Sequence, residues 1–191
     1  KDRDGHIRIP GFYDRVQPPS GTEQEAWARL PLDEQQYTRG EMGRRELVGE
    51  PEIPLFGRLW ARPTLEVNGL LSGFTGEGAK TVLPATAMAK ISMRLVPDQD
   101  PQKIGDLFES YVRKVCPKTV ELKITRMHGG NPWMTEFDNK YVRAAGRAIE
   151  QGFGKAPVFT REGGSIPVVA TFQRELGLPC VLFGVGLPGE D

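Results

Sequence analysis

Histidine and cysteine are both scarce in this chain, which has two of each among its 191 residues. The cysteines, Cys116 and Cys180, are too far apart in the sequence to form a Cys-x-x-Cys pair or a disulfide framework. With only His6 and His128 beside them, the chain cannot by itself assemble a standard metal site rich in histidine and cysteine. We interpret the cysteines as reduced thiols of a cytoplasmic protein.

An excess of charge of either sign is also absent, because 25 lysines and arginines balance 25 aspartates and glutamates. Proteins that bind nucleic acid usually carry a basic excess, so this balance argues against a nucleic-acid partner. No apolar run approaches the ~20 residues that span a bilayer, and Lys1–Asp4 is charged, unlike a signal peptide. The composition predicts an ordinary globular chain of one or two domains with no membrane partner.

Alternation of apolar and polar residues marks the middle of the chain. Residues 64–69, 86–96 and 119–125 alternate in this way, which predicts three strands. Asp100–Pro101 is a helix-start signal, and apolar residues then recur at helical spacing, which predicts an amphipathic helix over 101–115. The order of these elements predicts an α+β fold, a ferredoxin-like sandwich with an antiparallel sheet and helices on one face, lacking its opening strand and helix.

The residues before this region carry weaker signals. Residues 1–22 hold three prolines and three glycines around Phe12 and Tyr13, which predicts either an ordered loop or an arm lying over an apolar surface. Residues 22–45 predict two short helices interrupted at Pro31, the first with a capping box beginning at Thr22. Helices this short are marginal without tertiary packing, so residues 21–59 are interpreted as a surface insertion of unassigned role.

The pattern changes after residue 133. Helices are predicted over 139–153 and 168–176, with a short strand at 158–160. The continuous apolar run at 180–185 predicts a strand buried on both faces of a parallel sheet. We therefore divide the chain into residues 1–133 and residues 134–191, the second being an incomplete portion of an α/β domain.

Two segments resemble nucleotide-binding loops and fail the test of context. Residues 73–81 are similar to a P-loop, but Ala79 displaces the lysine by one position and Pro84 disrupts the helix that would follow. Residues 184–189 have dinucleotide-binding spacing, but Pro188 and the end of the sequence leave no helix. Neither segment is interpreted as a nucleotide site.

The segment Arg161–Pro167 carries the most specific local signal. A Gly163-Gly164-Ser165 turn that runs into a helix beginning with proline offers free backbone N–H groups, a hydroxyl and the positive end of the helix. This arrangement can bind a carboxylate or a phosphate. The alternative is a plain turn between a strand and a helix, and the residues alone leave both readings open.

Three further residues are candidates for contacts with a ligand. Arg94 lies on the polar face of the second strand, where it either faces solvent or donates two hydrogen bonds to a carboxylate. His128 stands before two glycines and is either a surface residue or a donor to a substrate oxygen. Thr81 is by pattern only the first threonine of a strand.

Four segments in one order make the sequence similar to a known family. The chain resembles the carnosinase-like dipeptidase branch of metallopeptidase family twenty, the di-zinc family that also holds succinyl-diaminopimelate desuccinylase and carboxypeptidase G. The resemblance is close over residues 60–191 and loose over residues 1–20. The segments that carry it are Gly78–Pro84, Ser92–Asp98, His128–Trp133 and Thr160–Val168.

This resemblance implies a metal-dependent enzyme that hydrolyses a peptide bond next to a free C-terminal carboxylate. Its catalytic α/β domain holds two divalent ions, zinc or manganese, through an early His and Asp, a bridging Asp, a Glu or Asp and a late His. The early ligands are absent here. From this, and from Lys1 in place of an initiator methionine, we expect a lid domain plus part of a catalytic domain, with no catalytic residue, no metal at the family site and no activity alone.

By the same resemblance, the chain supplies groups that bind a small peptide substrate. Arg94 is expected to bind the substrate's C-terminal carboxylate, Thr81 and Ser165 to donate or accept hydrogen bonds, and Gly163 and Gly164 to line the pocket. His128 and Arg161 are further expected substrate-binding residues. The lid is expected to form a homodimer. Two alternatives stay open: a stand-alone dimerisation or binding module, and an N-acyl-amino-acid deacylase as the parent enzyme.

Overall fold

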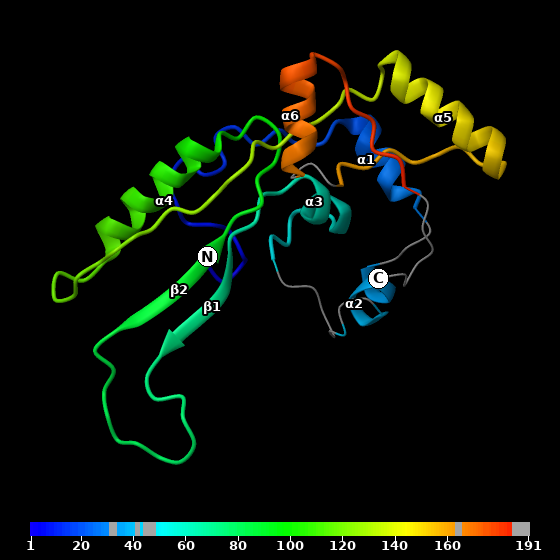
Figure 1. The fold of residues 1–191 in the computed structure, drawn as a ribbon. Coiled ribbons are helices and arrows are strands. Elements are labelled where there is room, and N and C mark those ends of the chain that lie inside the picture. The colour runs from blue at the N-terminus through cyan, green and yellow to red at the C-terminus, as the bar shows by residue number, and fades with distance from the viewer. Residues whose placement is uncertain (31–33, 41–42, 44–48, 163–165, 185–191) are drawn as a thin grey trace.

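The computed structural model describes residues 1–30, 34–40, 43, 49–162 and 166–184. No helix in these ranges is long and apolar enough to cross a membrane. These ranges contain two strands and six helices, and Figure 1 shows them arranged as an elongated α+β molecule. In chain order the elements are α1 (Gly21–Ala28), α2 (Glu34–Gly40), α3 (Leu55–Trp60), β1 (Glu66–Ser72), β2 (Ala87–Ser92), α4 (Pro101–Val115), α5 (Lys140–Phe153) and α6 (Pro167–Leu176).

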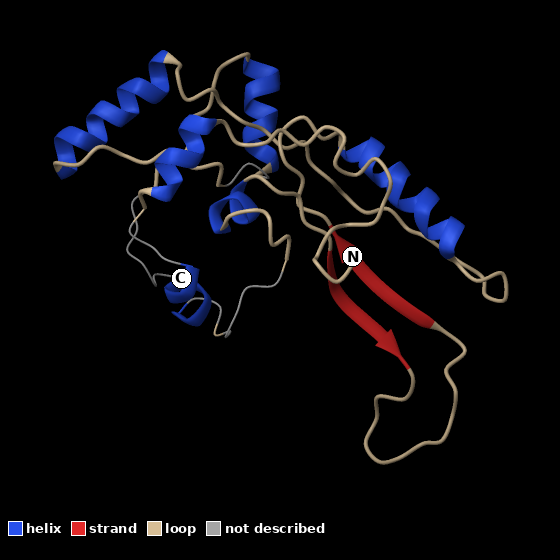
Figure 2. Cartoon of the chain, turned by 180° about the vertical axis from the view of Figure 1, so that it is seen from behind, coloured by secondary structure: helices blue, strands red, loops and turns tan. Residues whose placement is uncertain are grey.

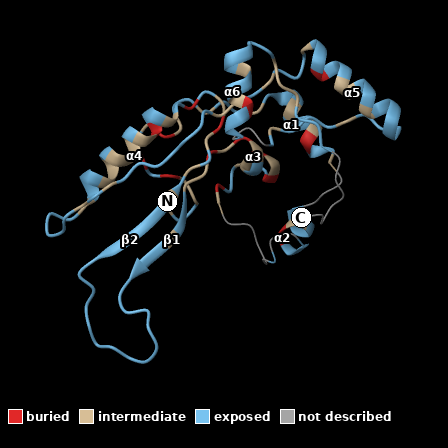
Figure 3. Cartoon of the chain, viewed as in Figure 1, coloured by how far each residue is buried: buried red, intermediate tan, exposed pale blue. Residues whose placement is uncertain are grey.

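The sheet is an antiparallel hairpin of β1 and β2, which confirms the first two predicted strands with shifted ends. Val67 pairs with Ile91 and Leu70 with Ala89, and the register is irregular between Val67 and Gly69. Residues 73–86 connect the strands as a long loop. Both strands are largely exposed along their length, as the pale blue ribbon of Figure 3 shows.

Helix α4 begins and packs as its sequence predicts. The Asp100 carboxylate accepts a hydrogen bond from the backbone N–H of Gln102 (2.8 Å), and Pro101 occupies the first turn. Ile104 is buried against Ile7, Ile9 and Phe12 of the N-terminal arm. The expectation that this arm lies over an apolar surface is therefore confirmed.

A buried glutamine fixes the arm to the turn before α4. The Gln99 side chain is 4% exposed, donates from Nε2 to the carbonyl oxygen of Phe12 (2.8 Å) and accepts from the N–H of Val96 (3.0 Å). Both polar ends of the side chain are thus satisfied, which a buried amide requires. Phe12, which is 1% exposed, is thus contacted through its backbone carbonyl by Gln99 and packs in the same buried cluster as Ile104.

The third predicted strand does not form. Residues 119–125 have no strand pairing and run alongside α4 (Figures 1 and 2). At the end of this segment Arg126 donates to Asp106 (2.6 Å) and Glu109 (3.0 Å), both on α4. A helix cannot offer the ladder of backbone groups that a strand needs, so the alternating pattern alone does not produce one.

The helices of the second part form where the sequence predicts them, but its strands do not. Asn139 caps α5 by accepting from the N–H groups of Tyr141 and Val142, and α6 spans residues 167–176. Residues 158–160 and the described part of 180–185 lie outside any sheet. Leu182 and Phe183 are 48% and 54% exposed, so this run is not buried on two faces as predicted.

The described residues of the insertion form three short helices, the last of which ends at Trp60. The capping box of α1 begins at Ser20 rather than at the predicted Thr22, because the Ser20 hydroxyl accepts from the N–H of Glu23 and the Glu23 carboxylate returns to the N–H of Ser20. No helix is predicted over residues 51–63, where α3 lies. Phe56 stacks on Trp60 one turn later, with ring centres 4.4 Å apart, which supports α3 despite the flanking prolines.

Candidate substrate-binding site

Arg94 is positioned by the backbone at the base of the hairpin, where the two strands end. Two residues after β2, the N–H of Arg94 donates to the Thr64 hydroxyl (3.3 Å) and its carbonyl accepts from the Thr64 N–H (2.9 Å). The backbone is therefore fixed. The Arg94 side chain is exposed and has no hydrogen bond or ion pair within the described residues. Its guanidinium is free to bind a carboxylate through two parallel hydrogen bonds.

Thr81 lies in the long loop at the opposite end of the hairpin. This loop is exposed throughout, and the neighbouring Lys80 Nζ lies 5.4 Å from the centre of the Phe74 ring. Figures 1 and 2 both show the loop extending away from α5 and α6. Within this one chain, therefore, the structure does not bring the loop that carries Thr81 to the other predicted site residues.

The segment that contains His128 is packed against the start of α6. A β carbon on Gly130 would lie 2.7 Å from Cβ and 3.4 Å from Cα of Pro167, so only glycine fits at this contact. On the other side, Gly129 approaches Pro101 at the start of α4. The exposed His128 is thus held close to the beginning of α6, which directly follows the predicted Gly-Gly-Ser turn.

Arg161 is paired within the chain. Its Nε and Nη2 donate to the two carboxylate oxygens of Glu23 on α1 at 2.6 and 2.7 Å, and both side chains are largely buried. Gly163, Gly164 and Ser165 lie outside the described residues. The substrate contacts of all these residues therefore stay predictions. The pairing of Arg161 had no signal in the sequence, because its partner lies 138 residues away.

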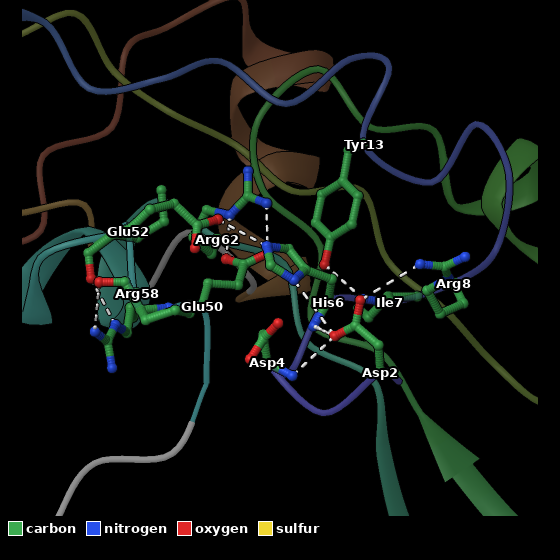
Figure 4. A network of polar contacts seen from close by, with 12 residues as sticks. Asp2, Asp4, His6, Ile7, Arg8, Tyr13, Glu50, Glu52, Arg58 and Arg62 are labelled. Carbon is green, nitrogen blue, oxygen red and sulfur yellow. Dashed lines mark hydrogen bonds and ion pairs between the residues drawn. The ribbon is translucent and has the colours of Figure 1, made fainter.

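A second polar cluster lies beside the N-terminal arm (Figure 4). Glu50 and Arg62 form two hydrogen bonds of 2.6 Å each, and Arg62 also covers the face of Tyr13 at 4.3 Å. Burial pushes the pKa of Glu50 upward, but the hydrogen bonds and charge of Arg62 outweigh burial and lower this pKa. The pair is already satisfied and offers no free group for chemistry.

The same cluster includes the described residues that come nearest to a metal site. The ligand atoms of Asp2, Asp4 and His6 lie within 4.8 Å of one another. They are engaged locally: Asp2 accepts from the N–H groups of Asp4 (3.1 Å) and His6 (2.9 Å), and His6 Nε2 lies 2.7 Å from Glu52. This set is not the family's pattern of a bridging Asp with paired His and carboxylate ligands, so the described residues do not fit the two-metal centre.

The hydrogen bond with Glu52 gives His6 an altered titration. This contact, reinforced by the charges of Glu52 and Asp2, raises the pKa of His6 above its ordinary value even though partial burial opposes the charged form. The N-terminal turn and the segment before α3 are therefore joined by an ion pair whose strength depends on pH.

Comparison with known proteins assigns the family. The family model described as "Peptidase dimerisation domain" matches residues 16–120, more than half of the chain. The chain belongs to this family of metallopeptidase lid domains.

Among its relatives are a Cys-Gly metallodipeptidase of Candida albicans, 33% identical over 100% of this chain and 39% of that protein. Another is the human Beta-Ala-His dipeptidase, 30% identical over 97% of this chain and 37% of that protein. The chain thus spans about two fifths of the length of these curated relatives.

Solved structures agree with the fold. The chain matches an M20 family metallo-carboxypeptidase of Sulfolobus solfataricus with a TM-score of 0.77 at 27% identity, covering 92% of this chain and 39% of that one. Human carnosine dipeptidase 1 matches with a TM-score of 0.76 at 28% identity, covering 92% and 38%. The predicted α+β lid fold and the recognised family are therefore confirmed, while the division into residues 1–133 and 134–191 stays a prediction.

Proposed function

We propose that this chain forms the substrate-gripping and dimer-forming part of a metal-dependent dipeptidase that cleaves an amide bond next to a free C-terminal carboxylate. Support comes from two dipeptidases at 30–33% identity over nearly the whole chain. The observation that carries the proposal is Arg94, an exposed guanidinium on a fixed backbone with no partner among the described residues. It can hold the carboxylate that such a substrate always presents.

In this proposal the substrate is held by groups from separate parts of the chain. Arg94 binds the terminal carboxylate, and the predicted Gly163-Gly164-Ser165 turn together with the start of α6 supplies N–H groups and the Ser165 hydroxyl. His128 donates to a substrate oxygen, and Thr81 adds a hydrogen bond from the hairpin loop. Two divalent ions, zinc or manganese, would supply the activated water when held by residues other than these, and the 191-residue chain alone is proposed to be inactive.

The proposal extends to a homodimer built on the lid. On one face of the hairpin, where Val67 pairs with Ile91 and Leu70 with Ala89, the side chains of Val67 and Leu70 are 59% and 77% exposed. An isolated two-stranded hairpin is marginal in water, so a second copy covering this apolar surface would stabilise it. The two free cysteines fit work in the reducing cytoplasm.

The test measures hydrolysis of a dipeptide and of the same dipeptide with a C-terminal amide. Both substrates are given to the whole protein supplied with zinc or manganese. We expect wild type to prefer the free carboxylate, and Arg94→Ala to lose that preference with a fall in kcat/KM of roughly 10–100-fold, the worth of a charge-assisted hydrogen-bonded pair. Lys90→Ala, which removes another exposed cation from the hairpin, is the control and should change little.

Two outcomes would contradict the proposal. If Arg94→Ala lowered kcat/KM equally for the free acid and for the amide, Arg94 would not bind the substrate's carboxylate. Faster cleavage of N-acetyl amino acids than of dipeptides would favour the deacylase alternative. The stand-alone module is favoured only by the exposed hairpin, and a whole protein that dimerises without hydrolysing any of these substrates would support it.

A further inference from the structure

The insertion is anchored on the segment that precedes the predicted substrate-binding turn. Trp27 of α1 is 3% exposed, and its indole Nε1 donates to the carbonyl oxygen of Phe159 at 3.0 Å. Trp60 of α3 packs edge-on against Trp27 with ring centres 5.2 Å apart. Figure 1 shows α1 and α3 beside the C-terminal helices, away from the hairpin. A part of the predicted lid is therefore docked on the predicted catalytic part.

The same docking places a fork of hydrogen bonds on Arg161. Nε and Nη2 bind both oxygens of Glu23, and Nη1 donates to the carbonyl oxygen of Gln17 at 3.3 Å. The side chains of Arg161 and Glu23 are 10% and 17% exposed. The edge of the guanidinium that binds a carboxylate in parallel is thus occupied by the chain's own Glu23.

Glu23 has a second role at the start of α1. Its Oε2 accepts from the N–H of Ser20 at 2.7 Å and from the Ser20 hydroxyl at 2.9 Å. Burial alone would raise the pKa of Glu23, but the hydrogen bonds from Arg161 and Ser20 lower it, so the carboxylate is charged near neutral pH. One carboxylate therefore joins the first turn of α1 to Arg161.

We propose that Glu23 and Arg161 are positioning residues that hold the backbone of residues 157–162 in place, directly before the segment predicted to bind substrate. Arg161 acts through the backbone it anchors and not by touching the substrate. The inference rests on the proposed function for its catalytic consequence, and on the contacts of Glu23, Trp27 and Arg161 for its structural one. We call these three residues with Gln17 and Phe159 the clamp.

Glu23→Gln in the whole protein separates the clamp from the helix cap. Glutamine at this position retains the capping box but removes the charge that faces Arg161. We expect KM for a dipeptide to rise about tenfold with kcat changed much less, because the substrate is misplaced before chemistry begins. Amide hydrogen exchange at residues 157–162 should accelerate in the same variant.

The control is Glu25→Gln, which removes a carboxylate from the same helix two residues further on. The Glu25 side chain is 74% exposed, and its contact with Arg29 is long, at 3.9 Å, and therefore weak. KM and amide hydrogen exchange should stay at wild-type values. A KM that is unchanged in Glu23→Gln, or changed equally in Glu25→Gln, would overturn the positioning role.

The double variant Glu23→Gln, Arg161→Gln guards against loss of folding. The double variant leaves no buried charge unpaired. If the two residues act as a pair, its KM should be no higher than the higher of the KM values of Glu23→Gln and Arg161→Gln. Additive losses would overturn the pairing. If wild type hydrolyses no dipeptide, the proposed function fails, whereas the clamp is then decided by exchange alone: unaltered exchange at 157–162 in Glu23→Gln would refute it.

Discussion

The N-terminal arm and the β1–β2 hairpin lie next to each other, joined at their edge by the ion pair between Lys1 and Glu66 at 2.9 Å, and they differ in how they use apolar residues. The arm buries Phe12 to 1% exposure under α4, whereas the hairpin leaves Leu70 at 77%. Figure 3 shows the exposed side of this contrast as pale blue along both strands. The arm is part of the core of this chain. The hairpin instead leaves apolar side chains exposed, and these form the surface that the proposed homodimer would bury.

The largest expected effect comes from breaking the core side of this contrast. Phe12→Ala should lower the free energy of unfolding by roughly 3–5 kcal/mol, because it removes a fully buried ring and leaves a cavity beside Ile104. Phe74→Ala removes the same ring from the exposed hairpin loop, where the residue is 47% exposed. It should cost less than about 1 kcal/mol. Urea unfolding of both variants measures the difference, and similar losses would refute the assignment of the arm to the core.

An intermediate effect is expected on the hairpin side. Leu70→Glu should leave the stability of the single chain within about 0.5 kcal/mol while abolishing the dimer, because a charge is placed in the apolar surface that the partner covers. Light scattering after size exclusion reports the mass. Lys118→Glu, an exposed charge change in the turn after α4, should stay dimeric. A Leu70→Glu protein that is still a dimer would show that the hairpin is not the interface.

The smallest effect concerns the pH dependence of the arm. The pKa of His6 is raised in the folded protein by Glu52, so the contact stabilises fully below the ordinary histidine pKa of about 6.5 and is lost as pH rises through the folded value. The melting temperature of wild type relative to His6→Gln should therefore decrease between pH 6 and pH 9. A difference that is constant across this range would show that His6 and Glu52 do not interact in solution.

Elements that depend on local interactions are predictable from the sequence, whereas elements that depend on distant partners are not. Helix α4 was predictable because Asp100, Pro101 and the apolar spacing are local signals. The segment 119–125 carries an equally clear alternation, but a strand also needs a neighbour, which no local pattern provides. The lack of a neighbouring strand also explains why Leu182 is exposed although its apolar run predicts a buried strand.

The candidate site divides in the same way. The motifs around Arg94, His128 and the Gly-Gly-Ser turn identified the family, which the comparisons confirm, from short segments alone. The contacts of Arg161 with Glu23 and of Trp27 with Phe159 join residues far apart in sequence and had no such signal. Only the capping box of α1 has a local sequence signal, and the sequence predicts it at Thr22, two residues after its observed start at Ser20.

The long span of the clamp also orders the events of folding. Glu23 and Arg161 are 138 residues apart, so bringing them together carries the entropy loss of closing a very long loop. The hairpin and α4 close over much shorter distances along the chain and are free to form first. During synthesis, α1 must emerge from the ribosome well before its docking partner exists. The insertion can therefore dock only after the C-terminal part has been synthesised, and the contacts of the clamp form late in folding.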